Sequence, residues 1–402
     1  MKFSKSSQLF LVSLIGLLVA GLLTACQIVT IDYVFVAASA GNTSGSAGQI
    51  YTYATDSQSG ALRTGAATVS SGGTSPVAMA VSSDYNNLYV ANKGNNTVVH
   101  FSVSSDGVLT QVDSVTLSTT PVALTVNAAS TYLYVVSGTS SATLTEYALS
   151  SGKIGSATAT QPLSLSSNAG DTVIPTAVAV LPNSGAVYVT AYDQSAYNPS
   201  GSTTSSANPG WVFGYTVASG GALTATTGSP YESGTKPVAI VIDPTGSFVY
   251  AADYPNNELV GYVVQSTNAL NFMVNGPFKT GNEPTALTID PRGKYLYVAN
   301  SLDSSVSSYT ITMSTGAPST VVSASSSTST TDTLPMSIAV DPALGRYVYT
   351  ANYVGNSISG FRLAADSGAL STTQATPYVT GAYPTAIVIV PHGNHAIQVV
   401  TR

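Results

Sequence analysis

Charged side chains are scarce in this sequence, at 7% of 402 residues, where a typical soluble domain has about 25%. Disorder does not follow, because 44% of the residues are hydrophobic and disordered chains lack that apolar content. The polar surface must therefore consist of Ser, Thr, Asn and Gln. Such a surface offers few cations to a polyanion, and the formal net charge is −6, so the composition argues against nucleic acid as a partner.

Cysteine is also nearly absent. Cys26 is the only one, which excludes an intrachain disulfide and any cysteine-rich metal site. Common catalytic motifs are missing as well: there is no Gly-x-Ser-x-Gly elbow, no His-Glu-x-x-His motif, no phosphate loop and no calcium loop. The sequence therefore predicts neither a cofactor nor a metal ion.

An apolar run near the N-terminus reads as an export signal. Lys2 and Lys5 precede an apolar core from Leu9 to Leu23, which is typical of a signal peptide. The core has 15 residues, fewer than the about 20 that a membrane-spanning helix needs.

Leu23-Thr24-Ala25-Cys26 resembles a bacterial lipobox. The resemblance implies that residues 1–25 are removed, that Cys26 is acylated, and that residues 26–32 form a short tether. The protein would then be extracytoplasmic and held at the membrane by its lipid, in the outer membrane where one is present. An ordinary signal with an incidental cysteine, or an uncleaved anchor, are the alternatives.

One unit recurs along the rest of the chain and is clearest from Glu283 to Asn300. Pro284 opens a short apolar run, Asp290-Pro291-Arg292-Gly293 is a turn signal, and an aromatic and β-branched run follows from Tyr295 to Ala299. This pattern predicts two strands in a hairpin. The opening proline occurs seven times, as Pro76, Pro121, Pro175, Pro237, Pro284, Pro335 and Pro384.

A third strand in each unit carries one aromatic residue, and a Gly- or Asn-started turn then leads to a fourth strand. The aromatic residues are Tyr53, Phe101, Tyr147, Tyr215, Tyr262, Tyr309 and Phe361. Four strands in a period of about 40–50 residues are the signature of a β-propeller. The sequence therefore predicts an all-β, seven-bladed propeller with four-stranded blades over residues 33–402.

The ring is expected to close by pairing the two ends of the chain. The first blade starts at its second strand, Val34–Ala38, and lacks an innermost strand, which the last apolar run, Ala386–Val390, can supply. Closure removes exposed sheet edges. The pattern of Ala396–Val400 predicts another second strand, which would compete with Val34–Ala38 for one place in the blade. Either one of the two strands is displaced to the outside of the blade, or the propeller has eight blades. Seven blades are favoured.

The repeats carry a family resemblance. Tyr89-Val90-Ala91-Asn92, Tyr297-Val298-Ala299-Asn300 and Tyr349-Thr350-Ala351-Asn352 resemble the repeats of the Tyr-Val-Thr-Asn propeller proteins. With the Pro-x-Ala strands and Asp-Pro-x-Gly turns, they resemble the seven-bladed lactonase family, which includes 6-phosphogluconolactonase-like enzymes. The resemblance implies lactone hydrolysis by charged and His side chains around a central pocket, although none of those residues can be matched here one by one.

Lys236 and Glu283 are the candidate catalytic residues. They stand just before the opening prolines of neighbouring blades, and the loops before these prolines share one face, around the central mouth. In a chain so poor in charge they could form an acid/base pair or bind a polar ligand. The alternative is a plain surface ion pair worth about 0–1 kcal/mol.

Aromatic side chains are expected around the same mouth. Tyr192, Tyr254 and Tyr353 follow second strands, and Tyr383 precedes the last opening proline, so they could form walls suited to sugar rings.

The loop from Tyr192 to Gly210 is far longer than its counterparts and is either functional or a tolerated insertion. Asp193 and Trp211 at its ends are further candidates for ligand contact. Asp253 is another candidate for ligand contact. At the same place in other blades the chain has Asn92, Asn300 and Asn352, and a residue type that recurs in this way favours turn capping over ligand binding.

Two further pairs of polar residues are not favoured as catalytic residues. His100 and Glu146 occupy matching places before the third-strand aromatic residue, so a structural hydrogen bond is favoured over catalysis. His392 and His395 fall in a turn on the opposite face and are poor catalytic candidates.

These observations favour a binding module for a carbohydrate, a small ligand or an envelope protein, acting as a monomer. The alternative function is hydrolysis of an unphosphorylated sugar or aliphatic lactone, with Glu283 positioning or activating water and Lys236 stabilising the oxyanion. A passive surface coat is a third interpretation.

Overall fold

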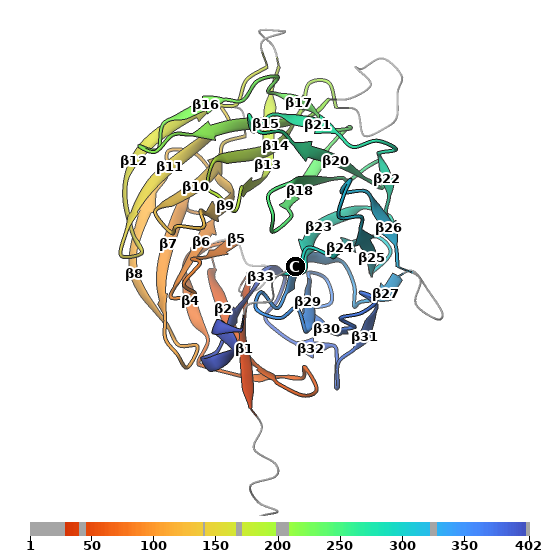
Figure 1. The fold of residues 1–402 in the computed structure, drawn as a ribbon. Helices are drawn as coiled ribbons and strands as arrows, with labels where there is room; N and C mark the ends of the chain where they lie inside the picture. Colours follow the sequence, from red (N-terminus) through yellow and green to blue (C-terminus); the bar gives the residue numbers. More distant parts are fainter. Residues whose placement is uncertain are drawn as a thin grey trace, which may run out of the picture.

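A computed structural model describes residues 29–39, 46–139, 141–165, 171–197, 209–321 and 328–398. These residues form seven antiparallel sheets arranged as blades around a central axis (Figure 1). The predicted all-β, seven-bladed propeller is thereby confirmed. The predicted signal and Cys26 lie outside the described residues. Within those residues, no helix is long and apolar enough to cross a membrane.

Each blade runs from an innermost strand beside the axis to an outer strand. The innermost strands are β5 (Pro76–Val81), β9 (Pro121–Val126), β13 (Val173–Val180), β18 (Pro237–Ile242), β23 (Pro284–Ile289), β28 (Pro335–Val340) and β33 (Pro384–Pro391). The second strands are β1 (Thr30–Ala38), β6 (Asn87–Asn92), β10 (Tyr132–Ser137), β14 (Ala186–Asp193), β19 (Phe248–Asp253), β24 (Tyr295–Asn300) and β29 (Tyr347–Asn352). The third strands are β2 (Ala47–Asp56), β7 (Thr97–Val103), β11 (Thr143–Ser150), β15 (Gly210–Val217), β20 (Glu258–Val264), β25 (Ser305–Ile311) and β30 (Ser357–Leu363).

The outer strand is continuous in two blades, as β8 (Leu109–Thr116) and β12 (Lys153–Pro162). In the others it forms two pieces that both pair with the third strand. The pieces are β3 (Leu62–Thr64) and β4 (Val69–Thr74), β16 (Leu223–Ala225) and β17 (Tyr231–Glu232), β21 (Leu270–Phe272) and β22 (Phe278–Lys279), β26 (Pro318–Thr320) and β27 (Thr328–Thr330), and β31 (Leu370–Thr372) and β32 (Tyr378–Val379). The sequence did not predict this break. An outer strand is hydrogen-bonded on one side only, so an interruption there removes few bonds.

Buried tyrosines of the second strands tie each blade to the next. The hydroxyl of Tyr297 donates a 2.9 Å hydrogen bond to the Gly368 carbonyl oxygen, in the outer hairpin turn of the following blade. Tyr89, Tyr188, Tyr250 and Tyr349 make the equivalent bond to Gly152, Asn268, Gly316 and Gly60. The side chains are fully buried, and the bonds satisfy a polar group that burial would otherwise penalise. The repeated third-strand aromatic residues are all buried.

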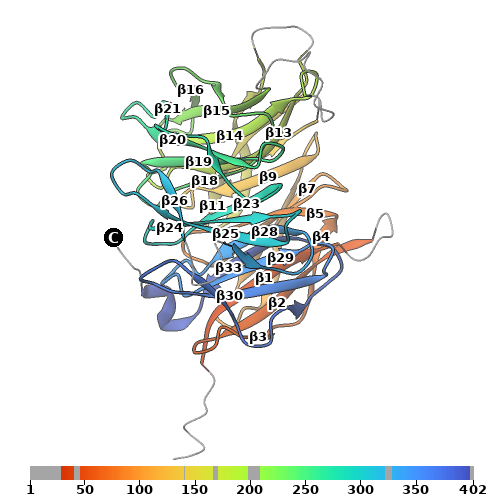
Figure 2. The same cartoon turned by 90° about the vertical axis from the view of Figure 1, so that its right-hand side faces the viewer.

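The ring closes as the sequence predicts, because β33 is the innermost strand of the blade formed by β1, β2 and β3. Ala38 of β1 pairs with Pro384 and Asp32 with Pro391, and the two strands lie side by side in Figure 1 and Figure 2.

The predicted strand over Ala396–Val400 is wrong within the described residues. Ala396 belongs to a 3-10 helix, η1 (Gly393–Ile397), and the last two residues of that range lie outside them. β1 already occupies the second-strand place, and the buried side chain of His395 holds this segment as a helical turn.

His100 and Glu146 are both buried, as expected for structural residues, but they do not partner each other. His100 lies 2.9 Å from the side-chain oxygen of Asn87 through Nε2, 3.3 Å from an Asp113 oxygen through Nδ1, and stacks on Tyr89. Glu146 accepts a 2.6 Å hydrogen bond from the Thr158 hydroxyl.

Replacing Glu146 with glutamine is expected to stabilise the protein at neutral pH and to leave it unchanged near pH 4. Burial is the main reason that the pKa of Glu146 lies above its ordinary 4.5. The folded protein therefore keeps a proton that the unfolded chain has already released. The free energy of unfolding of the wild type must then fall as pH rises above the ordinary pKa and through the folded one. Denaturant unfolding of both proteins across this pH range measures the difference in their free energies of unfolding. A difference that does not change with pH would contradict the prediction.

Candidate active site at the mouth of the central channel

A pocket of about 370 Å³ opens around the axis, where the innermost strands begin. It is lined by Val77, Thr176, Lys236, Val238, Tyr254, Thr285, Met336, Tyr353 and Thr385. Six of these nine residues directly follow an opening proline, so the pocket wall is built by the repeat itself. Its volume lies in the range of small-molecule sites.

The threonines of this wall are occupied by structural hydrogen bonds. The hydroxyls of Thr176, Thr285 and Thr385 donate to the carbonyl oxygens of the opening prolines in the next blade, at 2.6, 2.7 and 2.7 Å. These bonds tie neighbouring innermost strands together around the axis. Because the hydroxyl protons are already used, the polar groups best placed to act on a ligand belong to Lys236 and the tyrosines.

Lys236 lies among three tyrosine rings. Its Nζ is 5.2 Å from the ring centres of Tyr192 and Tyr197 and 5.6 Å from that of Tyr254, within the range of cation–π attraction. The sequence predicted Tyr192 and Tyr254 at the mouth but missed Tyr197. Tyr197 returns toward the axis because its backbone N–H donates to the Asp193 carbonyl oxygen, a turn inside the long loop.

Glu283 stands beside this group, at the start of the next blade. Its Oε2 accepts a 3.3 Å hydrogen bond from the Ser301 hydroxyl. Burial, and then the Glu283 carboxylate, raise the pKa of Tyr254 to about 12, so the Tyr254 phenol stays protonated. No ion pair joins Lys236 to Glu283 among the described residues, so the two do not neutralise each other directly.

The backbone of Glu283 is held in a strained conformation. Its φ is 54°, a left-handed value uncommon for a residue other than glycine, and its N–H donates a 2.8 Å hydrogen bond to the Asn257 side chain. Tyr383 has the same φ and the equivalent bond from its N–H to Asn356. Ser75 and Leu334, at the same place before their opening prolines, also have a left-handed φ, so this conformation belongs to the repeat. Tyr383 packs against Tyr353, with ring centres 5.1 Å apart.

Five predicted ligand contacts are not among the residues that line the pocket: Tyr192, Asp193, Trp211, Asp253 and Tyr383. Tyr192 lies against Lys236 and Tyr383 against Tyr353, whereas the other three serve the fold. Asp253 is fully buried and accepts hydrogen bonds from the backbone N–H groups of Thr235 and Lys236, which is the capping role. It thereby holds the segment that carries Lys236. Asp193 likewise caps its own loop by accepting a hydrogen bond from the Ser195 backbone N–H. Trp211 packs against the apolar core between two blades.

The arrangement brings together a carboxylate, an ammonium group and protonated phenols at one pocket. Hydrolysis of an ester uses such groups, since a base can accept a proton from water while a cation or a donor stabilises the oxyanion.

The family model that describes the lactonase, seven-bladed β-propeller, matches residues 47–166 and 213–332 of this chain. The chain belongs to this lactonase family. No curated protein matches it by sequence.

Solved structures of similar fold include the periplasmic gluconolactonase of Pseudomonas aeruginosa. It has 17% identity and a TM-score of 0.69, and the match covers 90% of this chain and 99% of that one. A candidate 6-phosphogluconolactonase from Bacteroides fragilis NCTC 9343 has 16% identity and a TM-score of 0.67, with coverage of 90% and 98%. Another from Bacteroides uniformis ATCC 8492 has 15% identity and a TM-score of 0.71, with coverage of 90% and 100%. At these identities the likeness concerns the lactonase fold alone.

Proposed function

We propose that this protein is a lactone hydrolase that acts at the mouth pocket on an unphosphorylated lactone. The observation that carries the proposal is that Lys236 lines the pocket and Glu283 interacts with Tyr254 of the pocket wall, in a chain of the lactonase family. This function replaces the binding module that composition favoured.

In the proposed reaction, Glu283 accepts a proton from a water molecule while the water oxygen attacks the lactone carbonyl carbon. The Lys236 ammonium and the Tyr254 hydroxyl stabilise the oxygen that becomes negative. The ring C–O bond then breaks, and the leaving oxygen takes a proton back from Glu283. The product is a hydroxy acid, and the Glu283 carboxylate is regenerated.

The pocket chemistry supports an unphosphorylated substrate. A phosphoryl group carries close to two negative charges and is usually held by several cations or backbone donors. Lys236 is the one cationic side chain among the pocket-lining residues, and it is already surrounded by tyrosine rings. The remaining wall consists of three apolar residues, three hydrogen-bonded threonines and the tyrosines Tyr254 and Tyr353, which suits a sugar or aliphatic lactone.

Turnover of a lactone panel tests this proposal. Proton release is followed for an unphosphorylated sugar lactone, an aliphatic lactone and a phosphorylated sugar lactone. We expect hydrolysis of one or both unphosphorylated classes above background, and at least about a tenfold lower kcat/KM for the phosphorylated one. Replacing Lys236 with methionine keeps the length and removes the charge, and should lower kcat by about 10²–10³-fold. Lys153→Met, on an outer strand, is the matched control; failure to hydrolyse any lactone would overturn the proposal.

A carbohydrate-binding module is the second candidate. The Tyr353 and Tyr383 rings pack together beside the pocket, and aromatic faces of this kind stack on sugars. A binding module would take up unmodified sugars in a calorimetric titration and leave every lactone intact, so the same preparation separates the two functions.

A further inference from the structure

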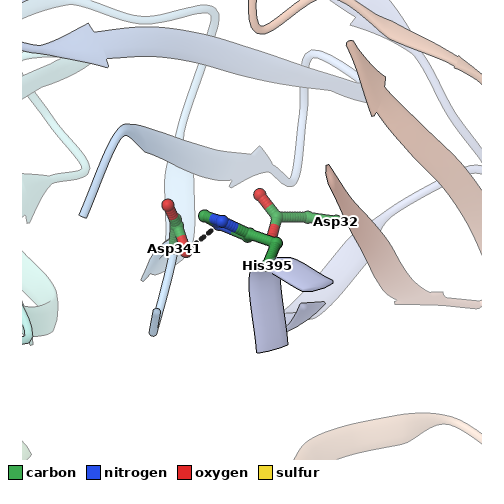
Figure 3. Close-up of side chains that lie close together, drawn as sticks. All are labelled: Asp32, Asp341 and His395. Carbon is green, nitrogen blue, oxygen red and sulfur yellow. Dashed lines mark hydrogen bonds and ion pairs between the residues drawn. The ribbon is translucent and has the colours of Figure 1, made fainter. Parts of the chain in front are cut away.

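A second group of functional side chains lies at the opposite end of the blades from the pocket. Asp32 from β1, Asp341 directly after β28, and His395 from η1 meet there, and each is at most 5% exposed (Figure 3). Asp32 pairs with Pro391, whereas the mouth end of the same strands pairs Ala38 with Pro384. This group is therefore separate from the proposed active site.

Asp32 is an unusual residue for its place. The register puts it where the other blades carry residues such as Asn86, Lys294 and Arg346, which are exposed. Asp32 is fully buried, and neither of its carboxylate oxygens has a hydrogen-bond partner among the described residues. A buried carboxylate without hydrogen bonds is costly, and such a group needs a compensating cation or a proton.

The other two residues are oriented by their surroundings. Asp341 accepts hydrogen bonds from the backbone N–H groups of Ala343 and Arg346, at 2.9 and 3.0 Å. The Nδ1 atom of His395 is 3.2 Å from the Gln398 side-chain oxygen, which can only accept. When Nδ1 donates to this oxygen, a neutral imidazole has a lone pair on Nε2 that can bind a cation. Metal-binding histidines are commonly fixed in this way.

The spacing of the three side chains fits one small cation. Nε2 of His395 is 3.1 Å from an Asp341 oxygen and 3.4 Å from an Asp32 oxygen, and the three atoms lie within 4.8 Å of one another. Ligands held at about 2.0–2.2 Å in a tetrahedral arrangement are separated by roughly 3.3–3.6 Å. We propose that Asp32, Asp341 and His395 bind a divalent first-row transition-metal ion, such as Zn²⁺, with water as a fourth ligand.

The donor set favours this class of ion over the alkaline-earth ions. One imidazole nitrogen with two carboxylates suits Zn²⁺ and its neighbours, whereas Ca²⁺ takes six to eight oxygen ligands and Mg²⁺ an octahedral oxygen shell. Two carboxylates and a neutral imidazole also balance the charge of a divalent cation. Among the described residues, Arg346 is the other charged group that acts on Asp32, and it does so through its charge without a hydrogen bond.

The proposed ion would connect three parts of the chain at the closure of the ring. Asp32 lies on the first strand, His395 in the last described element, and Asp341 in the neighbouring blade formed by β28 and β29. Because the ligands are brought together only by the folded ring, binding would stabilise the folded protein. The site is independent of lactone hydrolysis.

Metal binding by the purified full-length protein tests the proposal. After treatment with a chelator, Zn²⁺ is titrated by calorimetry and the thermal midpoint is measured with and without the ion. We expect one ion per chain and a higher midpoint with Zn²⁺, but no response to Ca²⁺ or Mg²⁺. Asp32→Asn and His395→Gln preserve shape and should each weaken binding by more than about 100-fold.

The pair of His100 and Asp113 supplies a matched control, because it contains a buried histidine with one carboxylate instead of two. Asp113→Asn should bind Zn²⁺ as the wild type does. Co²⁺ provides a readout that does not depend on stability, since a tetrahedral site gives it intense visible absorption. No binding by the wild type, or equal binding by the Asp32 and His395 variants, would overturn the proposal. In that case His395 would instead bridge the two carboxylates as an imidazolium ion.

Discussion

Replacing Glu283 with glutamine is expected to lower kcat for lactone hydrolysis by about 10²–10⁴-fold, the range that general acid–base catalysis contributes. Glutamine keeps the size of the side chain and can still accept the hydrogen bond from the Ser301 hydroxyl, but it cannot accept a proton from water. The measurement is the initial rate of proton release on the best lactone of the panel, with KM determined separately.

KM should change little, because Glu283 acts on water in the proposed reaction and makes no essential contact with the bound lactone. Glu232→Gln is the matched control, since Glu232 is exposed on the short outer strand β17. A wild-type kcat in the Glu283 variant would remove this residue from the mechanism, even if lactone hydrolysis itself were established.

Ending the chain at Tyr383 is expected to abolish cooperative unfolding. This truncation removes β33, which pairs along β1 and buries Ile387, Ile389 and Val390. Each such side chain contributes roughly 1.5–3 kcal/mol, so about 5–9 kcal/mol is lost, which is comparable with the whole stability of a typical protein, about 5–15 kcal/mol. The exposed edge of β1 should also promote aggregation.

Thermal unfolding followed by circular dichroism, together with size-exclusion chromatography, measures this effect. A chain that ends at Pro391 is the control, because it keeps β33 and loses only the segment that contains η1. We expect the control to unfold cooperatively at a lower midpoint than the full chain. A cooperative transition in the chain that ends at Tyr383 would show that the ring tolerates an open blade.

The function could be approached from the sequence only in part. Lys236 and Glu283 were predicted because they are charged residues at a repeated place in a chain with little charge, and their catalytic role stays a prediction. Tyr197 was missed because no second copy of its loop exists for comparison, and its place beside Lys236 depends on a turn within that loop. The proposed metal-binding group was not predicted for a related reason: its members are far apart in the chain, and His395 was considered only as a poor catalytic candidate in a turn on the opposite face.

The sequence by itself determined the blades, their number and their closure. Opening prolines, turn residues and buried aromatic residues act over a few neighbouring positions, and seven copies of one pattern leave little freedom in the fold. Only the tertiary structure decided which polar side chains meet. The tyrosines gather around Lys236, and Asp32 meets Asp341 and His395, because closing the ring brings distant segments together. A local pattern cannot encode such contacts, since they depend on how the seven blades are placed around the axis.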